Sequence, residues 1–81
     1  MEHDVTIAVH LSEDDTDTLA TMTLELRGDH FEAVGKARRN PIDPPLPTIG
    51  EELAIARALA NLEEAVMEAA RDRIERFTVH V

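Results

Sequence analysis

The chain has 81 residues, enough for one domain spanning residues 1–81, and it has no cysteine, so disulfides and thiol chemistry are excluded. No apolar run is long enough for a signal peptide or a membrane span, which predicts a cytoplasmic protein without membrane contact. The net charge of −9 disfavours unaided binding to a polyanion, and two aromatic residues, Phe31 and Phe77, are too few to stack bases.

Three stretches in the first half of the chain alternate apolar and polar residues, which is the pattern of half-buried β-strands. They predict strands over about residues 5–11, 18–27 and 30–39. Gly28-Asp29, between the second and third stretches, is typical of a two-residue type II′ hairpin turn. The residues expected on the apolar side are Val5, Ile7, Val9 and Leu11, then Ala20, Met22, Leu24 and Leu26, then Phe31, Ala33, Gly35 and Ala37.

A proline-rich connection and one long helix follow the predicted strands. Residues 40–47 hold all four prolines and exclude a helix or an interior strand. Thr48 followed by Glu51 has the spacing of a capping box and predicts a helix over about residues 49–76, with negative charge in its first turn. The tail from Phe77 to Val81 alternates apolar residues and is expected to add a short edge strand or to pair with a second subunit.

The predicted helix has two apolar stripes and one polar face, and the stripes together exceed the arc of about 100° that covers one side of a sheet. We therefore expect two neighbours to bury it, and a second copy of the chain is the natural second neighbour for so small a domain. The stripe expected in the core comprises Ile55, Leu59, Leu62, Val66 and Ala69. The stripe expected at the dimer interface comprises Leu53, Ala56, Ala60, Met67 and Ile74. The polar face comprises Arg57, Asn61, Glu64, Glu68, Arg71, Asp72 and Glu75.

The sequence thus predicts a dimeric α+β fold in which a three-stranded antiparallel meander precedes one long C-terminal helix. The small residues of the third strand leave room for this helix to approach the sheet closely.

Residues with catalytic or metal-binding chemistry lack the spacing that such sites require. The four histidines do not match zinc-ligand spacings, and the only serine, Ser12, has no predicted histidine neighbour. The acidic turn lacks the glycine and the closing glutamate of a calcium loop and is typical of a solvated hairpin tip. We therefore predict no catalytic residue, no metal site and no cofactor. The acidic turn comprises Glu13, Asp14, Asp15 and Asp17.

Two charged surfaces leave alternatives open. Lys36, Arg38 and Arg39 form one basic cluster at the end of the third strand, which is either a plain exposed strand end or a contact for RNA or another anion. The helix ridge formed by Glu64, Glu68 and Asp72 is either a solvated face or a docking surface for a basic protein.

The stretch from Gly35 to Asp43 and the stretch from Pro47 to Leu62 carry motifs of a known family. In family notation they match GxARxNPxD and PxIGDELAxARALxDL, with Glu51 and Asn61 each replacing an aspartate. The chain therefore resembles an actinobacterial family of small proteins, classed as a domain of unknown function with a fold like the double-stranded-RNA-binding domain. The resemblance implies a homodimer, a role in stress or dormancy and a likeness to ribosome hibernation factors. It implies no catalytic residues.

Overall fold

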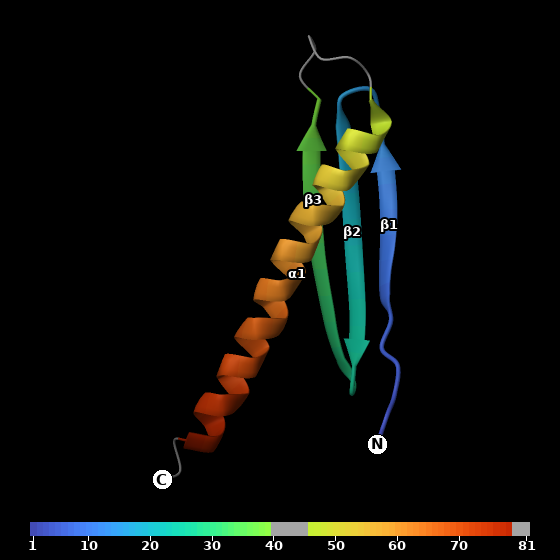
Figure 1. Ribbon diagram of the computed structural model, residues 1–81. Coiled ribbons are helices and arrows are strands. Elements are labelled where there is room, and N and C mark those ends of the chain that lie inside the picture. The colour runs from blue at the N-terminus through green and yellow to red at the C-terminus, as the bar shows by residue number, and fades with distance from the viewer. Residues whose placement is uncertain (40–45, 79–81) are drawn as a thin grey trace.

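The computed structural model describes residues 1–39 and 46–78, which form three strands followed by one helix (Figure 1). The predicted α+β fold with the order β-β-β-α is confirmed. Most of the predicted proline-rich connection, residues 40–45, lies outside the described residues. The elements are β1 (Ile7–Glu13), β2 (Asp17–Leu26), β3 (Asp29–Arg38) and α1 (Pro47–Thr78).

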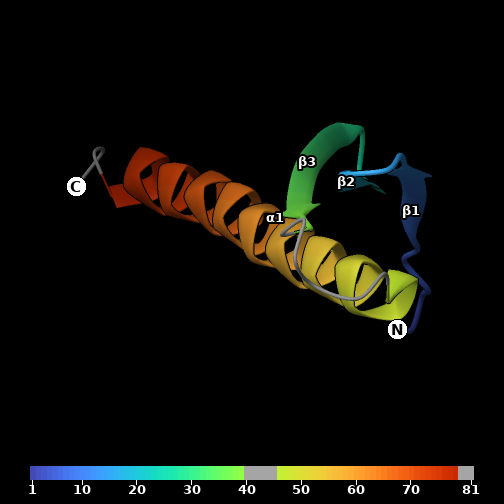
Figure 2. The same cartoon turned by 90° about the horizontal axis from the view of Figure 1, so that it is seen from above.

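The sheet is an antiparallel meander in the order β1-β2-β3, and its register places the predicted apolar residues on one side. Val9 pairs with Met22, and Met22 pairs with Ala33, so these three side chains share a face. Figure 2 shows that α1 lies on one side of the sheet only. The opposite side carries the alternate, mostly polar residues.

The turn between β2 and β3 differs from the predicted one. Leu26 pairs with Asp29, so Arg27 and Gly28 are the two central residues. Both have positive φ values, 51° for Arg27 and 86° for Gly28. Two positive values define a type I′ turn, whose twist matches that of the flanking strands, whereas the predicted type II′ turn has only one.

The core is built from small side chains where α1 crosses the sheet. Ala20, Ala54 and Ala58 are fully buried. At Gly35 a Cβ atom would lie 2.1 Å from the Ala54 carbonyl oxygen and 2.2 Å from the Ala58 nitrogen. The backbones of β3 and α1 are therefore in direct contact, which confirms the predicted close approach. The buried apolar residues are Ala20, Met22, Leu24, Ala33, Ala37, Ala54, Ala58 and Leu62.

The face of α1 that contacts the sheet is only partly the predicted one. Leu62 is buried, and Ile55 and Val66 are half-buried beside it, but Leu59 is 47% exposed. The centre of the contact is instead the pair Ala54 and Ala58, which belonged to neither predicted stripe. At the distance that Gly35 imposes, a methyl group fills the space beneath the helix and a leucine does not fit.

Both ends of α1 extend beyond the predicted bounds. The helix begins at Pro47, whose missing N–H is not needed at a first helical position, and the Leu46 carbonyl accepts a hydrogen bond from the Ile49 amide at 3.1 Å. Thr48 is therefore the second helical residue rather than the cap, and Glu51 lies beyond the first turn, which has no acidic residue. At the other end Phe77 is helical rather than extended, while residues 79–81 lie outside the described residues.

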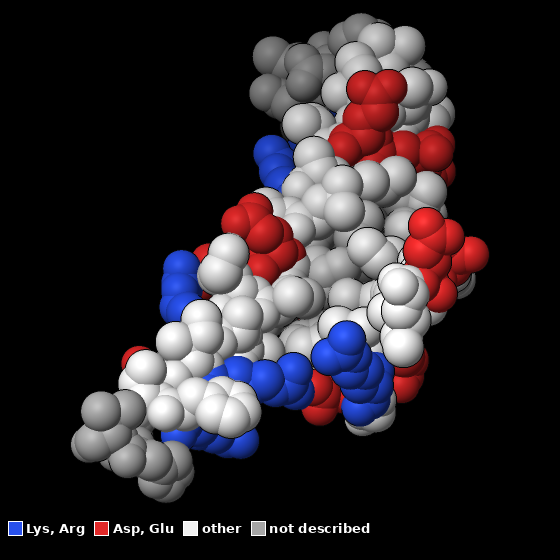
Figure 3. All heavy atoms as spheres, turned by 60° about the horizontal axis from the view of Figure 1, so that its bottom comes forward, with Lys and Arg blue, Asp and Glu red and all other residues white. Residues whose placement is uncertain are grey.

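Charge is unevenly distributed along the fold. No lysine or arginine occurs before Arg27 in the sequence, so the formally charged side chains of β1 and β2 are all Asp or Glu. Figure 3 shows basic side chains at the end of the molecule formed by the last turns of α1 and the β2–β3 turn. One of them, Arg73, pairs with Asp29 and ties the end of the helix to that turn. Within residues 1–39 and 46–78, no helix has the length and apolarity that crossing a bilayer requires.

Candidate functional site

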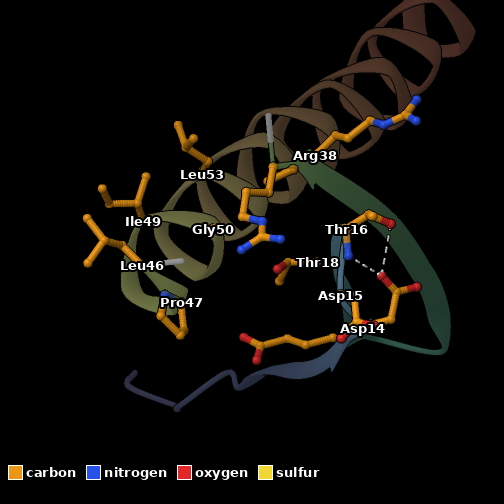
Figure 4. A pocket seen from close by; sticks show the side chains of 13 residues that line it. Asp14, Asp15, Thr16, Thr18, Arg38, Leu46, Pro47, Ile49, Gly50 and Leu53 are labelled. Carbon is orange, nitrogen blue, oxygen red and sulfur yellow. Dashed lines mark hydrogen bonds between the residues drawn. The ribbon is translucent and has the colours of Figure 1, made fainter. Parts of the chain in front are cut away.

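A cavity of about 700 Å³ lies where the β1–β2 turn, the end of β3 and the start of α1 meet (Figure 4). The turn contributes acidic side chains, the strand end contributes Arg38 and Arg39, and the helix contributes Ile49 and Leu53. Thr18 is 9% exposed and lies beneath Gly50, where a Cβ atom would come within 3.0 Å of the threonine hydroxyl. The cavity is therefore lined by acidic and basic side chains and, on the side of the helix, by apolar ones.

The predicted basic cluster is exposed but divided between two surfaces. Arg38 and Arg39 line the cavity, and the Arg39 amide donates a hydrogen bond of 2.7 Å to the Thr16 carbonyl. Lys36 points away from α1, and its Nζ lies 3.8 Å from a carboxylate oxygen of Asp17. The acidic turn therefore partly offsets the positive charge of the cluster.

The helix adds a fourth cation beside this cluster. Arg57 donates a hydrogen bond of 2.7 Å from Nη1 to the Lys36 carbonyl, and Asn61 donates one of 2.7 Å from Nδ2 to the Val34 carbonyl. The sequence assigned both side chains to a solvent-facing polar face, but they cover the free edge of β3. The available signal was their position three residues after Ala54 and Ala58, the two alanines that contact the sheet.

The acidic turn is organised by Asp14 and its own backbone. Its Oδ1 accepts hydrogen bonds from the amides of Thr16, at 2.8 Å, and Asp17, at 2.7 Å. These amides, with that of Asp17 contributing most, hold the pKa of Asp14 below its usual value of 3.8. Among the residues that the structure describes, no three His, Asp or Glu side chains gather as metal ligands. The contacts of Asp14 with these two amides stabilise the turn between β1 and β2.

One histidine has a defined environment on the sheet face opposite α1. His30 Nδ1 lies 2.6 Å from Glu25 Oε1, and Nε2 lies 3.6 Å from Glu32 Oε2. The hydrogen bond to Glu25, followed by that to Glu32, raises the pKa of His30 above 6.5. The group is half-exposed and lies at the other end of β3 from the cavity, so it forms a surface ion pair.

The predicted dimer interface faces solvent along the whole helix. Leu53, Met67 and Ile74 are 44%, 43% and 62% exposed, and Ala56 and Ala60 are exposed between them. This stripe lies opposite the face that carries the buried alanines. It therefore stays a prediction, on a surface that this chain leaves uncovered.

The acidic helix ridge is also exposed and partly bridged by arginines. Arg71 Nη1 lies 3.2 Å from Glu64 Oε1, and Arg76 Nη2 lies 3.0 Å from Asp72 Oδ2. Glu68 lies between these pairs on the same ridge. Both alternatives for the ridge, solvation and docking, remain compatible with this arrangement.

Comparison with known proteins identifies relatives over almost the whole chain. The sequence model of the Rv2632c-like family matches residues 3–81. The uncharacterized protein Rv2632c of Mycobacterium tuberculosis is 40% identical over 72 residues, which are 89% of this chain and 77% of the relative. The uncharacterized protein Mb1767 of Mycobacterium bovis is 36% identical over 73 residues, 90% and 78% of the two chains. A crystal structure of Rv2632c superposes with a TM-score of 0.90 at 37% identity, covering 96% of this chain and 93% of that one.

Proposed function

The chain belongs to the Rv2632c-like family, and we propose that it is a non-enzymatic homodimer that acts by contacting another macromolecule. The observation that carries this proposal is the large exposed surface of the chain. The cavity, by contrast, lacks the side chains of a catalytic site. Among the described residues that line the cavity there is no histidine or serine, and Thr16 and Thr18 supply the only hydroxyl groups. These groups do not form a nucleophile with an adjacent base.

The dimer is supported by the surface that the chain exposes. A compact monomer of 9.0 kDa is expected to expose about 4,900 Å². This chain exposes 6558 Å², and its radius of gyration of 16.6 Å exceeds the value of about 12 Å for a compact domain of this length. The excess of about 1,700 Å² lies within the range of areas that each subunit of an obligate homodimer buries.

The macromolecular contact is assigned to the basic cluster, with RNA of the ribosome as the target. Lys36, Arg38 and Arg39 are exposed at one end of the molecule, and Arg57 is anchored beside them. Lys36 lies on the other side of the sheet, near Asp17, but all four cations share one end of the molecule, and we assign the phosphate contacts to them. In keeping with the family resemblance, we place this contact in the cytoplasm, in an accessory role during stress or dormancy.

Co-sedimentation with ribosomes of the host organism tests the RNA contact. Three phosphate contacts predict that the binding constant falls about 20- to 40-fold between 50 mM and 200 mM salt. The triple variant Lys36→Ala, Arg38→Ala, Arg39→Ala is expected to stay in the supernatant. The matched comparison uses single variants, Arg38→Ala in the cluster and Arg27→Ala outside it. Equal co-sedimentation of these two single variants would contradict the assignment.

The acidic helix ridge supports a second candidate, a contact with a basic protein. Glu64 and Glu68 are exposed on the half of α1 that runs past β3 and away from the sheet (Figure 1). The double variant Glu64→Lys, Glu68→Lys is expected to abolish capture of such a partner, with Asp15→Lys, Glu32→Lys, two exposed acids away from the ridge, as the charge-matched control. Capture retained by the ridge variant would count against this candidate.

A further inference from the structure

The inner face of β1 is a sheet surface that its own helix does not cover. Val9 pairs with Met22, and Ile7 pairs with Leu24, so these β1 side chains share the side of the sheet that α1 occupies. Met22 is 1% exposed and Leu24 8%, whereas Ile7 is 43% and Val9 46% exposed. Val5, in the segment before β1, is 47% exposed as well. One third of the sheet thus presents an apolar face to solvent.

The helix has a complementary uncovered part. At 32 residues α1 is about 48 Å long, whereas β2 and β3, with 10 residues each, span about 33 Å. Figures 1 and 2 show that α1 starts near the end of β1, crosses the sheet diagonally and leaves it past β3. On the projecting part Met67, Ile74 and Phe77 are 43%, 62% and 81% exposed. An apolar helix end therefore has no sheet beneath it.

The two uncovered surfaces do not meet within one chain. The pair between Arg73 and Asp29 holds the helix end beside the β2–β3 turn. β3 is at one edge of the sheet and β1 at the other, with β2 between them. The helix end therefore lies on the far side of the sheet from the bare strand.

We propose that the projecting end of α1, residues 66–78, lies on the inner face of β1 of a second copy, and that the second copy returns the same contact. The inference rests on the dimer proposed above and names the surface that receives the helix. Two identical helix-on-sheet contacts form an isologous pair with two-fold symmetry. Each copy then supplies the helix that the other copy's open strand lacks.

Charge complementarity favours this occupant. The receiving strand is flanked by Glu2, Asp4 and Glu13, and no lysine or arginine occurs before Arg27. The incoming segment carries three arginines, Arg71, Arg73 and Arg76, and three acids, Glu68, Asp72 and Glu75, and all three arginines lie in its last eight residues. Figure 3 shows acidic side chains along the border of this face opposite the basic helix end, with uncharged surface between them. The arginines of the last helical turns gain attraction when they lie beside an acidic strand, and the symmetry gives this attraction in both copies.

The surface area of the chain also matches the proposed contact. The excess of about 1,700 Å² per chain is sufficient for two reciprocal contacts in an obligate dimer. A helix-to-helix dimer through the solvent-facing stripe alone would leave Ile7 and Val9 exposed at 43% and 46%. The helix-on-sheet contact covers both the helix end and the strand.

Cysteine cross-linking tests the contact directly, because the natural chain has no cysteine. Val9→Cys and Ile74→Cys, carried on chains of different tag length, are mixed and oxidised. A disulfide between position 9 of one chain and position 74 of the other is expected, because the proposed contact brings these two positions together. Such a bond forms only when the two Cα atoms lie within about 7 Å. The control Ala8→Cys lies one residue away on the opposite face and is expected not to couple with Ile74→Cys. A 74–74 or a 9–9 disulfide as the main product would overturn the inference but leave the dimer in place.

A second measurement covers the case in which no disulfide forms. Val9→Glu is expected to raise the dissociation constant of the dimer about a hundredfold, because each dimer loses the burial of two valines. Ala8→Glu is the control and is expected to leave the constant unchanged. A Val9→Glu protein that dimerises like the wild type would overturn the helix-on-sheet contact alone. A wild-type protein that stays monomeric would overturn both this contact and the proposed dimer.

Discussion

Gly35→Ala is expected to be the most damaging single-methyl change in the core. The added Cβ would lie 2.1 Å from the Ala54 oxygen, 2.2 Å from the Ala58 nitrogen and 2.9 Å from the Ala58 Cα. All three are backbone atoms, so no side-chain rotation relieves the clash. Ordinary contact requires about 3.4 Å, so α1 has to move about 1 Å away from β3 and lose its packing against the sheet.

Overpacking of a tight core costs about 1–3 kcal/mol, and a clash with backbone on both sides belongs at the upper end. A loss of about 3 kcal/mol lowers the melting temperature of a domain of this size by roughly 12–24 °C. Because the chain has no Trp or Tyr, urea and thermal unfolding are best followed by circular dichroism at 222 nm.

Gly50→Ala is the matched control for Gly35→Ala. Its Cβ would meet only the Thr18 side chain, at 3.0 Å, and alanine improves helix propensity by about 1 kcal/mol. It is therefore expected to be neutral or mildly stabilising. Ala58→Gly is not expected to rescue Gly35→Ala, because the obstructing atoms belong to the backbone. A Gly35→Ala protein with wild-type stability would refute the backbone contact between β3 and α1.

Three further predictions concern polar contacts. Arg57→Ala and Asn61→Ala are each expected to lower the free energy of unfolding by about 1 kcal/mol, because each removes a hydrogen bond to β3; unchanged urea midpoints would contradict this. The lowered pKa of Asp14 means that its charge stabilises the fold above pH 3.8 and that this contribution is lost as the pH falls. The stability difference between wild type and Asp14→Asn is therefore expected to narrow in acid, and parallel pH curves would speak against the turn contacts. The raised pKa of His30 means that its contribution is present below pH 6.5 and is lost as the pH rises through the folded-state pKa. Glu25→Gln is expected to lower the His30 pKa in an NMR titration, and an unmoved titration curve would show that the pair does not form in solution.

The strands and their faces were predictable because alternation with a period of two assigns every side chain to one side of a sheet. The two-residue turn was placed one residue too late, which would pair Arg27 with His30 instead of Leu26 with Asp29. Arg27 occupies a positive-φ position that glycine, asparagine or aspartate more often takes, so the sequence favoured Gly28 as the first central residue.

The face of the helix was less predictable because the contact selects for small size rather than for hydrophobicity. Ala54 and Ala58 are fully buried, yet a search for large apolar residues favours Ile55 and Leu59. The close approach at Gly35 was inferred from the small residues of β3, but the matching small residues of α1 were not paired with it. Facing rows of Gly and Ala on a strand and a helix were the available signal.

The candidate site depends on contacts that local sequence patterns do not contain. Lys36, Arg38 and Arg39 were found because they are neighbours in the sequence. Arg57 joins them through the Lys36 carbonyl, a contact between residues 21 positions apart. Such a contact follows from the angle at which α1 crosses the sheet, and that angle is set by the core.

The central claim is that a second copy covers the surface that this chain leaves open, and its most direct test is sedimentation equilibrium of the wild-type protein. The proposed dimer predicts a species with twice the chain mass of 9.0 kDa, with dissociation only at concentrations well below those of the experiment. A folded species of 9.0 kDa across the whole concentration range would contradict the claim.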